Sequence, residues 1–105
     1  MLQITISRNK NNQIKFYKAE GHCNFGEKGK DVVCSGTSTL LQVAIYGLDK
    51  YCTIPPQAII SDGYLACVLS EINKESQVIL ETMLIGLRQI EEQYPDYVRI
   101  KENIE

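Results

Sequence analysis

The chain has 105 residues, of which 44% are apolar and 23% are charged, and its formal net charge is −2. A chain of this length forms one domain, residues 1–105, whose core needs neither a metal nor disulfide bonds to hold it together. The lysines and arginines are scattered along the sequence rather than aligned in a stripe, which disfavours a protein that binds nucleic acid directly.

The first eight residues do not form the charged leader and apolar block of a secretory signal. The longest nearly apolar run, Leu40–Leu48, is far too short to cross a bilayer. We therefore expect a cytoplasmic protein with no membrane partner.

The N-terminal residues predict a β-hairpin. Residues 2–8 and 13–19 alternate apolar and polar side chains, which is the pattern of strands with one buried face. Between them, Asn9–Asn12 is a turn-forming cluster. In the second strand, Ile14 and Phe16 are predicted to face inward.

A helix packed on the core is predicted from Val33 onward, after a loop over residues 21–30 that has three glycines and no apolar period. Asp31 stands just ahead of the helix and is the right residue type for an N-terminal turn. The stretch Ser35–Ser38 has poor helix propensity, which suits a first turn whose backbone approaches a substrate. The buried positions recur every three or four residues, at Val33, Thr37, Leu40, Leu41, Ala44, Ile45 and Leu48.

The second half of the chain repeats this order of elements. Strands are predicted over residues 57–61 and 64–70, joined by the hairpin signal Asp62-Gly63. A helix follows over residues 73–94, with Asn73 as its cap, then a strand over residues 97–101 and a frayed tail. The inner face of the helix is predicted to carry Ile79 or Leu80, then Met83, Leu84, Leu87 and Ile90.

The predicted order of elements is therefore ββαββαβ. Helices separated by antiparallel hairpins favour an α+β fold over a doubly wound parallel sheet. We expect two layers, in which a mixed or antiparallel sheet packs against two helices.

The four cysteines, Cys23, Cys34, Cys52 and Cys67, do not have the spacing of a zinc site, because no CxxC pair occurs. A metal site built on His22 with its two nearest cysteines is disfavoured as well, since adjacent ligands strain a tetrahedral site and a fourth ligand is missing. Disulfides are disfavoured without a secretory signal. We expect no metal and no other cofactor.

The candidate catalytic pair is Cys34 and His22, the only histidine of the chain. A cysteine at a helix N-terminus is favoured as thiolate, and an imidazole can take its proton and return it later. The backbone N–H groups of Ser35 and Gly36 are candidate donors to an oxyanion. Cys34 can also be read as a small buried thiol, and His22 as a solvated loop residue.

Several neighbours of this pair are candidate supporting residues. Asp31 can orient the imidazole, cap the helix, or do both. Ser38 lies one helical turn beyond Cys34 and bonds either within the site or to the backbone. Gly26 and Gly29 can act as hinges of a lid over an extended peptide, although an ordinary surface loop has the same composition.

The segment from Gly21 to Ser38, GHCNFGEKGKDVVCSGTS, resembles the motif of the ribosomal-processing cysteine protease family, Prp. In that family, Gly-His and a small residue precede Gly-x-Asp-(Ile/Val)-Val-Cys, and small residues and a serine follow. This sequence departs from the usual motif by having Cys23 and Ser35 in place of alanine and Val32 in place of isoleucine. Cys23 brings a second thiol near the site, where it can form a regulatory or artefactual disulfide.

The resemblance implies a bacterial cytoplasmic endopeptidase that acts as a homodimer. Such enzymes remove the short N-terminal extension of a large-subunit ribosomal protein, number twenty-seven in the usual naming, after paired aromatic residues. It implies that Cys34 is the nucleophile and His22 the general base and acid, with Asp31 and Ser38 in supporting roles.

Two other functions compete with proteolysis. A small dimeric adaptor that binds a nascent ribosomal protein would also use a mobile loop and a helix N-terminus to hold a peptide. Thiol redox chemistry between Cys23 and Cys34 would require a reversible disulfide.

Overall fold

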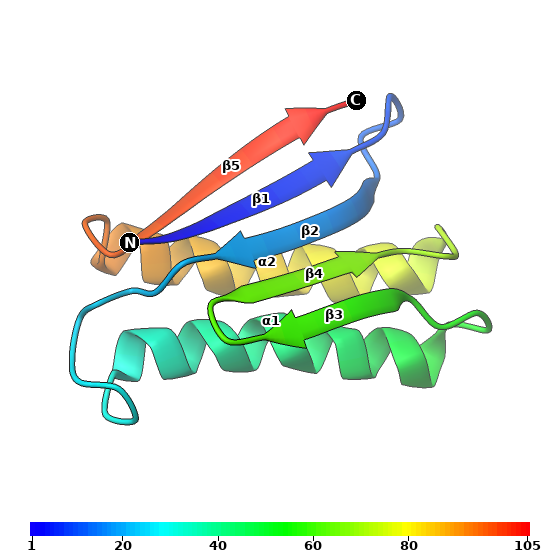
Figure 1. Cartoon of the computed structure of the whole chain (residues 1–105). Coiled ribbons are helices and arrows are strands. Elements are labelled where there is room, and N and C mark those ends of the chain that lie inside the picture. Colours follow the sequence, from blue (N-terminus) through cyan, green and yellow to red (C-terminus); the bar gives the residue numbers. More distant parts are fainter.

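The computed structural model describes all 105 residues as one layer of five strands and one layer of two helices (Figure 1). Both helices lie against the same face of the sheet. Neither helix combines the length and the apolar character that a membrane-spanning segment requires. In chain order the elements are β1 (Leu2–Arg8), β2 (Ile14–Glu20), α1 (Val32–Tyr51), β3 (Gln57–Ser61), β4 (Tyr64–Val68), α2 (Lys74–Gln93) and β5 (Val98–Ile104).

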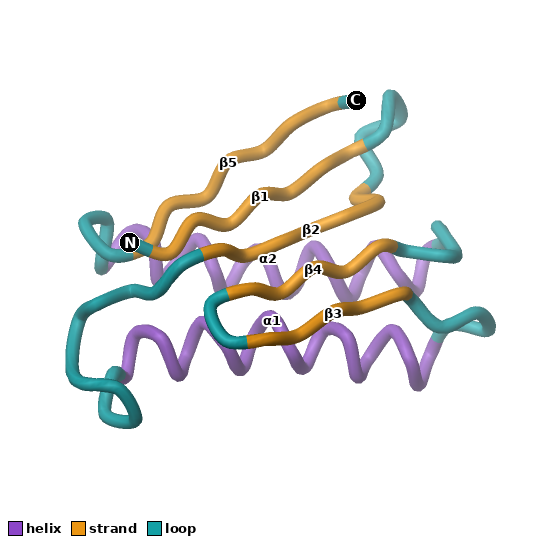
Figure 2. Tube along the Cα trace, in the orientation of Figure 1, coloured by secondary structure: helices purple, strands orange, loops and turns teal.

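The strands are arranged in the order β3-β4-β2-β1-β5. β5 runs parallel to β1, and the other neighbours are antiparallel, so the sheet is mixed. The predicted α+β fold, with two layers and the order ββαββαβ, is confirmed. Because β4 pairs with the end of β2, the β3–β4 turn lies beside the start of the loop that leads to α1 (Figure 2).

The prediction that Phe16 faces inward is wrong. Ile14 and Tyr17 are fully buried, whereas Phe16 is only partly buried. The cause is a β-bulge: Arg8 pairs with Ile14 and Ser7 pairs with Phe16, so Lys15 is an extra residue in β2. A bulge reverses the alternation of faces, which no count of apolar residues along one strand reveals.

The prediction of a frayed C-terminal tail is also wrong. β5 pairs with β1 along its whole length, from Val98 opposite Leu2 to Ile104 opposite Arg8. The N–H of Glu105 donates to the carbonyl oxygen of Arg8 at 2.9 Å. The charged end of β5 concealed this pairing in the sequence.

The core lies between the helices and the sheet. Tyr17 spans it: the side chain is fully buried, and its hydroxyl donates to the carbonyl oxygen of Leu41 in α1 at 2.9 Å. Of the predicted helix positions, Leu40, Ile79 and Ile90 are only partly buried but pack against the core. The predicted positions that are buried are Val33, Thr37, Leu41, Ala44, Ile45 and Leu48 in α1, and Leu80, Met83, Leu84 and Leu87 in α2.

A chain of ion pairs joins β1 and β5 to α2 at the end of the molecule far from the loop. Arg8 is only 8% exposed, and its guanidinium donates to both carboxylate oxygens of Glu81, at 2.7 and 3.0 Å, and to Glu102 at 2.9 Å. Arg88 binds the second oxygen of Glu102. Such bidentate bonds between buried and partly buried charges hold the two layers in register.

We expect Arg8→Met to lower the free energy of unfolding by about 2 kcal/mol, because Glu81 loses its only ion-pair partner and Glu102 keeps only Arg88. Urea denaturation at neutral pH measures this change. The control is Lys10→Met, since Lys10 is exposed in the β1–β2 turn and makes no ion pair. Equal stability of Arg8→Met and wild type would show that the ion pairs contribute nothing net.

Candidate active site

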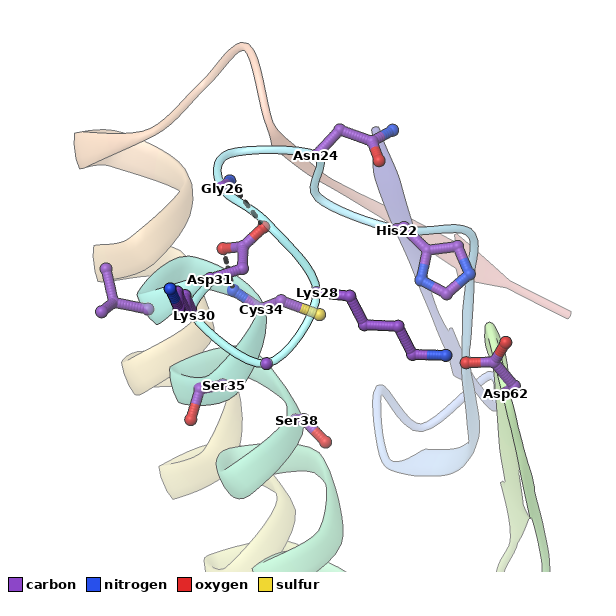
Figure 3. Close-up of a pocket in the computed structure, with 12 residues that line it drawn as sticks. His22, Asn24, Gly26, Lys28, Lys30, Asp31, Cys34, Ser35, Ser38 and Asp62 are labelled. Atoms are coloured by element: carbon purple, nitrogen blue, oxygen red, sulfur yellow. Dashed lines mark hydrogen bonds between the residues drawn. The ribbon is translucent and has the colours of Figure 1, made fainter.

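A cavity of about 650 Å³ opens where the β2–α1 loop, the first turns of α1 and the β3–β4 turn meet (Figure 3). Most of the residues that line it are polar or charged, and charged side chains of both signs are among them. The predicted site residues that line it are His22, Gly26, Gly29, Asp31, Cys34, Ser35 and Ser38. The fold therefore brings together residues that the sequence spreads over seventeen positions.

Cys34 is the third residue of α1 and is partly buried. Its backbone N–H donates to Oδ1 of the N-cap residue Asp31 at 2.9 Å. The sulfur stands in the first turn of α1, where the helix dipole favours negative charge, and it faces the cavity. Ser38 follows one turn later, where its hydroxyl accepts from Nε2 of Gln42 at 2.7 Å.

The predicted oxyanion donors Ser35 and Gly36 do not have the expected arrangement. The N–H of Ser35 donates to the carbonyl oxygen of Asp31 at 2.9 Å, because Ser35 already lies one position beyond the unpaired N–H groups of the helix. Gly36 does not line the cavity: a Cβ on it would contact Ile90 of α2 at 3.7 Å. Of the other N–H groups in the first turn, that of Val33 also acts on the Asp31 carboxylate, which leaves that of Val32.

The Asp31 carboxylate joins the loop to the helix. Oδ1 accepts from Cys34, and Oδ2 accepts from the N–H groups of Phe25 at 2.9 Å and Gly26 at 3.1 Å. Desolvation opposes ionisation, but the bonds from these N–H groups outweigh it and lower the pKa of Asp31 below its usual value. None of its hydrogen bonds goes to His22, so its contacts are those of a helix cap and a loop anchor.

His22 follows the end of β2 and is held over the β3–β4 turn. The N–H of Gly21 donates to the carbonyl oxygen of Gly63 at 2.9 Å, and both glycines have positive φ angles, +97° and +71°. A Cβ on Gly63 would lie 3.0 Å from Nε2 of His22, so the ring packs closely on the backbone of the turn, and the positive φ of Gly63 favours glycine there. The imidazole is exposed and lies across the cavity from Cys34 (Figure 3).

The β2–α1 loop is anchored at Phe25 as well as at Asp31. The Phe25 ring makes edge-to-face contacts with Tyr94 and Tyr97, with centroid distances of 5.3 and 5.2 Å. Between these anchors the tip of the loop, residues 26–30, is exposed. This aromatic cluster could not be expected from the sequence, because the tyrosines come from the α2–β5 connection.

Five cavity residues are not among the predicted site residues: Asn24, Lys28, Lys30, Val32 and Asp62. The Lys28 side chain extends from the loop toward Asp62, which lies on the same side of the cavity as His22 (Figure 3). In the sequence, Asp62 is visible only as the first residue of a hairpin turn. Its place in the site follows from the order of the strands, which puts the β3–β4 turn beside the end of β2.

A second, smaller cavity of about 190 Å³ continues from the first, with which it shares His22, Cys34, Ser38 and Asp62. It runs between α1 and the strands, and half of its lining residues are hydrophobic. The hydrophobic lining residues include Leu41 of α1 and, from the strands, Leu2, Ile60 and Leu65. The site is thus polar on one side of Cys34 and more apolar on the other.

All four cysteines are free, and Cys34 is the only one that is not buried. Burial, with a smaller contribution from the neighbouring Cys34, raises the pKa of Cys23 to about 12. Burial raises the pKa of Cys67 to about 11, against the opposing effect of a bond with Tyr17. No cluster of side chains has the composition of a metal site.

The model of the cysteine protease Prp family matches residues 1–99. The chain belongs to the Prp family of cysteine proteases. The chain is 30% identical to the ribosomal processing cysteine protease Prp of Bacillus subtilis, with 99% of each chain covered. It is 29% identical to the Prp of Staphylococcus aureus, with 95% of this chain and 97% of the relative covered.

Solved Prp structures have the same fold. The S. aureus Prp in complex with a covalently linked product peptide matches with a TM-score of 0.91 and 30% identity over 97% of this chain and 99% of that chain. The S. aureus enzyme with a substrate peptide matches with a TM-score of 0.86 and 28% identity over the same shares. The predicted family and the predicted enzyme class, a cysteine protease, are confirmed.

We expect Asp31→Ala to lower the free energy of unfolding by about 1 kcal/mol, because α1 loses its N-cap acceptor and the loop loses its anchor. The pKa of Asp31 is lower in the folded chain than in the unfolded chain. The ionised carboxylate therefore stabilises the fold fully above the unfolded pKa of about 3.9, and this stabilisation is lost as the pH falls through the folded pKa. The difference between Asp31→Ala and wild type should therefore shrink between pH 7 and pH 3 in chemical denaturation.

The matched control is Asp49→Ala, which removes an exposed carboxylate from the same helix. It should leave the free energy of unfolding within about 0.5 kcal/mol of wild type. A difference between Asp31→Ala and wild type that persists unchanged at pH 3 would contradict the role of the ionised carboxylate.

Proposed function

We propose that this protein is an endopeptidase that removes a short N-terminal extension from a large-subunit ribosomal protein, with Cys34 as nucleophile and His22 as general base and acid. The observation that carries this proposal is the position of the only unburied cysteine, in the first turn of α1 and across one cavity from the only histidine. The curated relatives named as ribosomal processing proteases support the substrate class.

In the proposed reaction, His22 takes the proton of Cys34, and the sulfur attacks the carbonyl carbon of the scissile peptide bond. The N-terminus of α1, with the N–H group of Val32, favours the negative charge that develops on the carbonyl oxygen. His22 then donates its proton to the leaving amine as the C–N bond breaks. Water, activated by the imidazole, hydrolyses the remaining thioester and frees the sulfur.

The shape of the site supports an extended peptide as substrate. The polar and the apolar cavity together form one groove that passes Cys34. The apolar half, with Leu41, Ile60 and Leu65, suits large apolar side chains on one side of the cut, such as the paired aromatic residues that the family resemblance implies. The loop anchored at Phe25 and Asp31 borders the polar half, and Gly26 and Gly29 are its proposed hinges.

We place this activity in the cytoplasm and in a homodimer. Apolar side chains are exposed on one side of α1 and on the edge strand β3, where Val43 is 54%, Tyr46 61% and Ile59 63% exposed. An unpaired edge strand and a neighbouring apolar helix face are features of surfaces that a second chain covers. Gel filtration with light scattering measures the mass of the assembly.

We expect Cys34→Ala and His22→Ala each to lower the rate of cleavage by about a thousandfold or more, since the two groups act as a unit. Mass spectrometry of the host ribosomal protein, before and after incubation, measures the loss of the extension. Cys52→Ala is the matched control, because it removes a buried thiol away from the cavity.

Cleavage by Cys34→Ala or His22→Ala at close to the wild-type rate would contradict the assignment of the pair. An adaptor that binds a nascent ribosomal protein gives a different result. The wild-type chain would then bind the ribosomal protein and leave its mass unchanged.

We also expect Cys34 to react with iodoacetamide much faster than the other three thiols at neutral pH. Burial keeps Cys23 and Cys67 inaccessible, and their raised pKa values, about 12 and 11, keep them protonated. Peptide mapping after timed alkylation measures the four rates. Similar rates for all four thiols would favour a non-enzymatic adaptor, and a reversible Cys23–Cys34 disulfide that turns over with small thiols would favour redox chemistry.

A further inference from the structure

Two aspartates line the cavity, and only one of them is free to act on His22. The carboxylate of Asp31 is occupied by the N–H groups of Phe25, Gly26 and Cys34. Asp62 is exposed, and its carboxylate accepts no hydrogen bond from the rest of the chain. Asp62 is thus an uncommitted negative charge in the wall of the site.

The backbone brings Asp62 to the imidazole. The bond from the Gly21 N–H to the Gly63 carbonyl joins the residue before His22 to the residue after Asp62. Gly63 faces the ring closely enough that a Cβ would lie 3.0 Å from Nε2. Both side chains line both cavities, and Figure 3 shows the carboxylate below the imidazole, across the site from Cys34.

We propose that Asp62 is the positioning residue of His22, which holds the ring over the β3–β4 turn and favours its protonated form while Cys34 carries the negative charge. The proposal rests on the proposed function, in which His22 takes and returns a proton. A carboxylate beside an imidazole favours the imidazolium, and this effect grows when a bound peptide excludes water from the groove.

Other charged and titratable groups also face the cavity. The loop contributes Lys28 and Lys30, α1 and its cap contribute Cys34 and Asp31, and Tyr64 lines the apolar half from β4. The Lys28 ammonium extends toward Asp62 and opposes its effect on the ring (Figure 3). Because both His22 and Asp62 are exposed, we expect a modest effect in the free enzyme and a larger one in the complex.

The direct test is the NMR signal of the His22 ring, which is unambiguous because the chain has only one histidine. In Asp62→Asn, the nuclear Overhauser contacts between the ring and Gly63 should weaken, since the ring is no longer held over the turn. Asn retains the size of the side chain, and the backbone of Asp62 does not have a positive φ, so the turn tolerates the substitution. Asp49→Asn removes an equal charge from the far part of α1 and should leave these contacts unchanged.

Unchanged ring contacts in Asp62→Asn, or an equal loss of them in Asp49→Asn, would overturn the proposal. The NMR measurement needs no substrate, so its failure is distinct from a failure of the proteolytic function. In cleavage assays, Asp62→Asn should lower kcat roughly threefold to tenfold with KM little changed, and Asp62→Glu should restore it. A kcat in Asp62→Glu as low as that in Asp62→Asn would assign the loss to the turn itself and contradict a positioning role.

Discussion

The carboxylate of Asp31 is the interaction on which the site depends. Its two oxygens bind the N–H of Cys34 on one side and those of Phe25 and Gly26 on the other, so one residue fixes the start of α1 and the path of the loop. The cap leaves Cys34 in the first turn, where the helix dipole acts on its sulfur. Because the same bonds occupy both carboxylate oxygens, Asp31 stabilises the helix and the loop and does not bind His22.

The rest of the site comes from the sheet. The order β3-β4-β2-β1-β5 places the β3–β4 turn beside the end of β2, and the bond between Gly21 and Gly63 joins them. His22 is thereby carried by two strands, whereas Cys34 is carried by a helix that Tyr17 ties to the same sheet. Cys34 thus stands on a helix, whereas His22 lies in the loop two residues after β2, and the Gly21–Gly63 bond fixes the start of that loop.

The sequence predicted what depends on local pattern and missed what depends on pairing. Helix periodicity, the caps Asp31 and Asn73 and the Asp62-Gly63 turn are local signals, and the elements follow them. The sequence does not reveal the inward face of β2, because the bulge at Lys15 depends on pairing with β1. It does not reveal the end of β5 either, because the charged residues there pair with β1.

At the site, the motif gave His22 and Cys34, which the fold places around one cavity. The motif did not indicate Asp62, because its proximity to His22 arises from the order of the strands. It also did not indicate that the Ser35 N–H donates to the Asp31 carbonyl oxygen, which depends on where α1 begins. Geometry that depends on the exact first residue of a helix cannot be expected from composition alone.

The most direct test of the account is to trap the covalent intermediate. With a peptide ester that carries the extension sequence, we expect acylation to be faster than hydrolysis of the acyl-enzyme, so acid quenching followed by peptide mapping locates the bond. We predict a thioester on Cys34 and none in Cys34→Ala. An acyl group on another residue, or no acyl-enzyme while the ester is still turned over, would contradict a mechanism built on this sulfur.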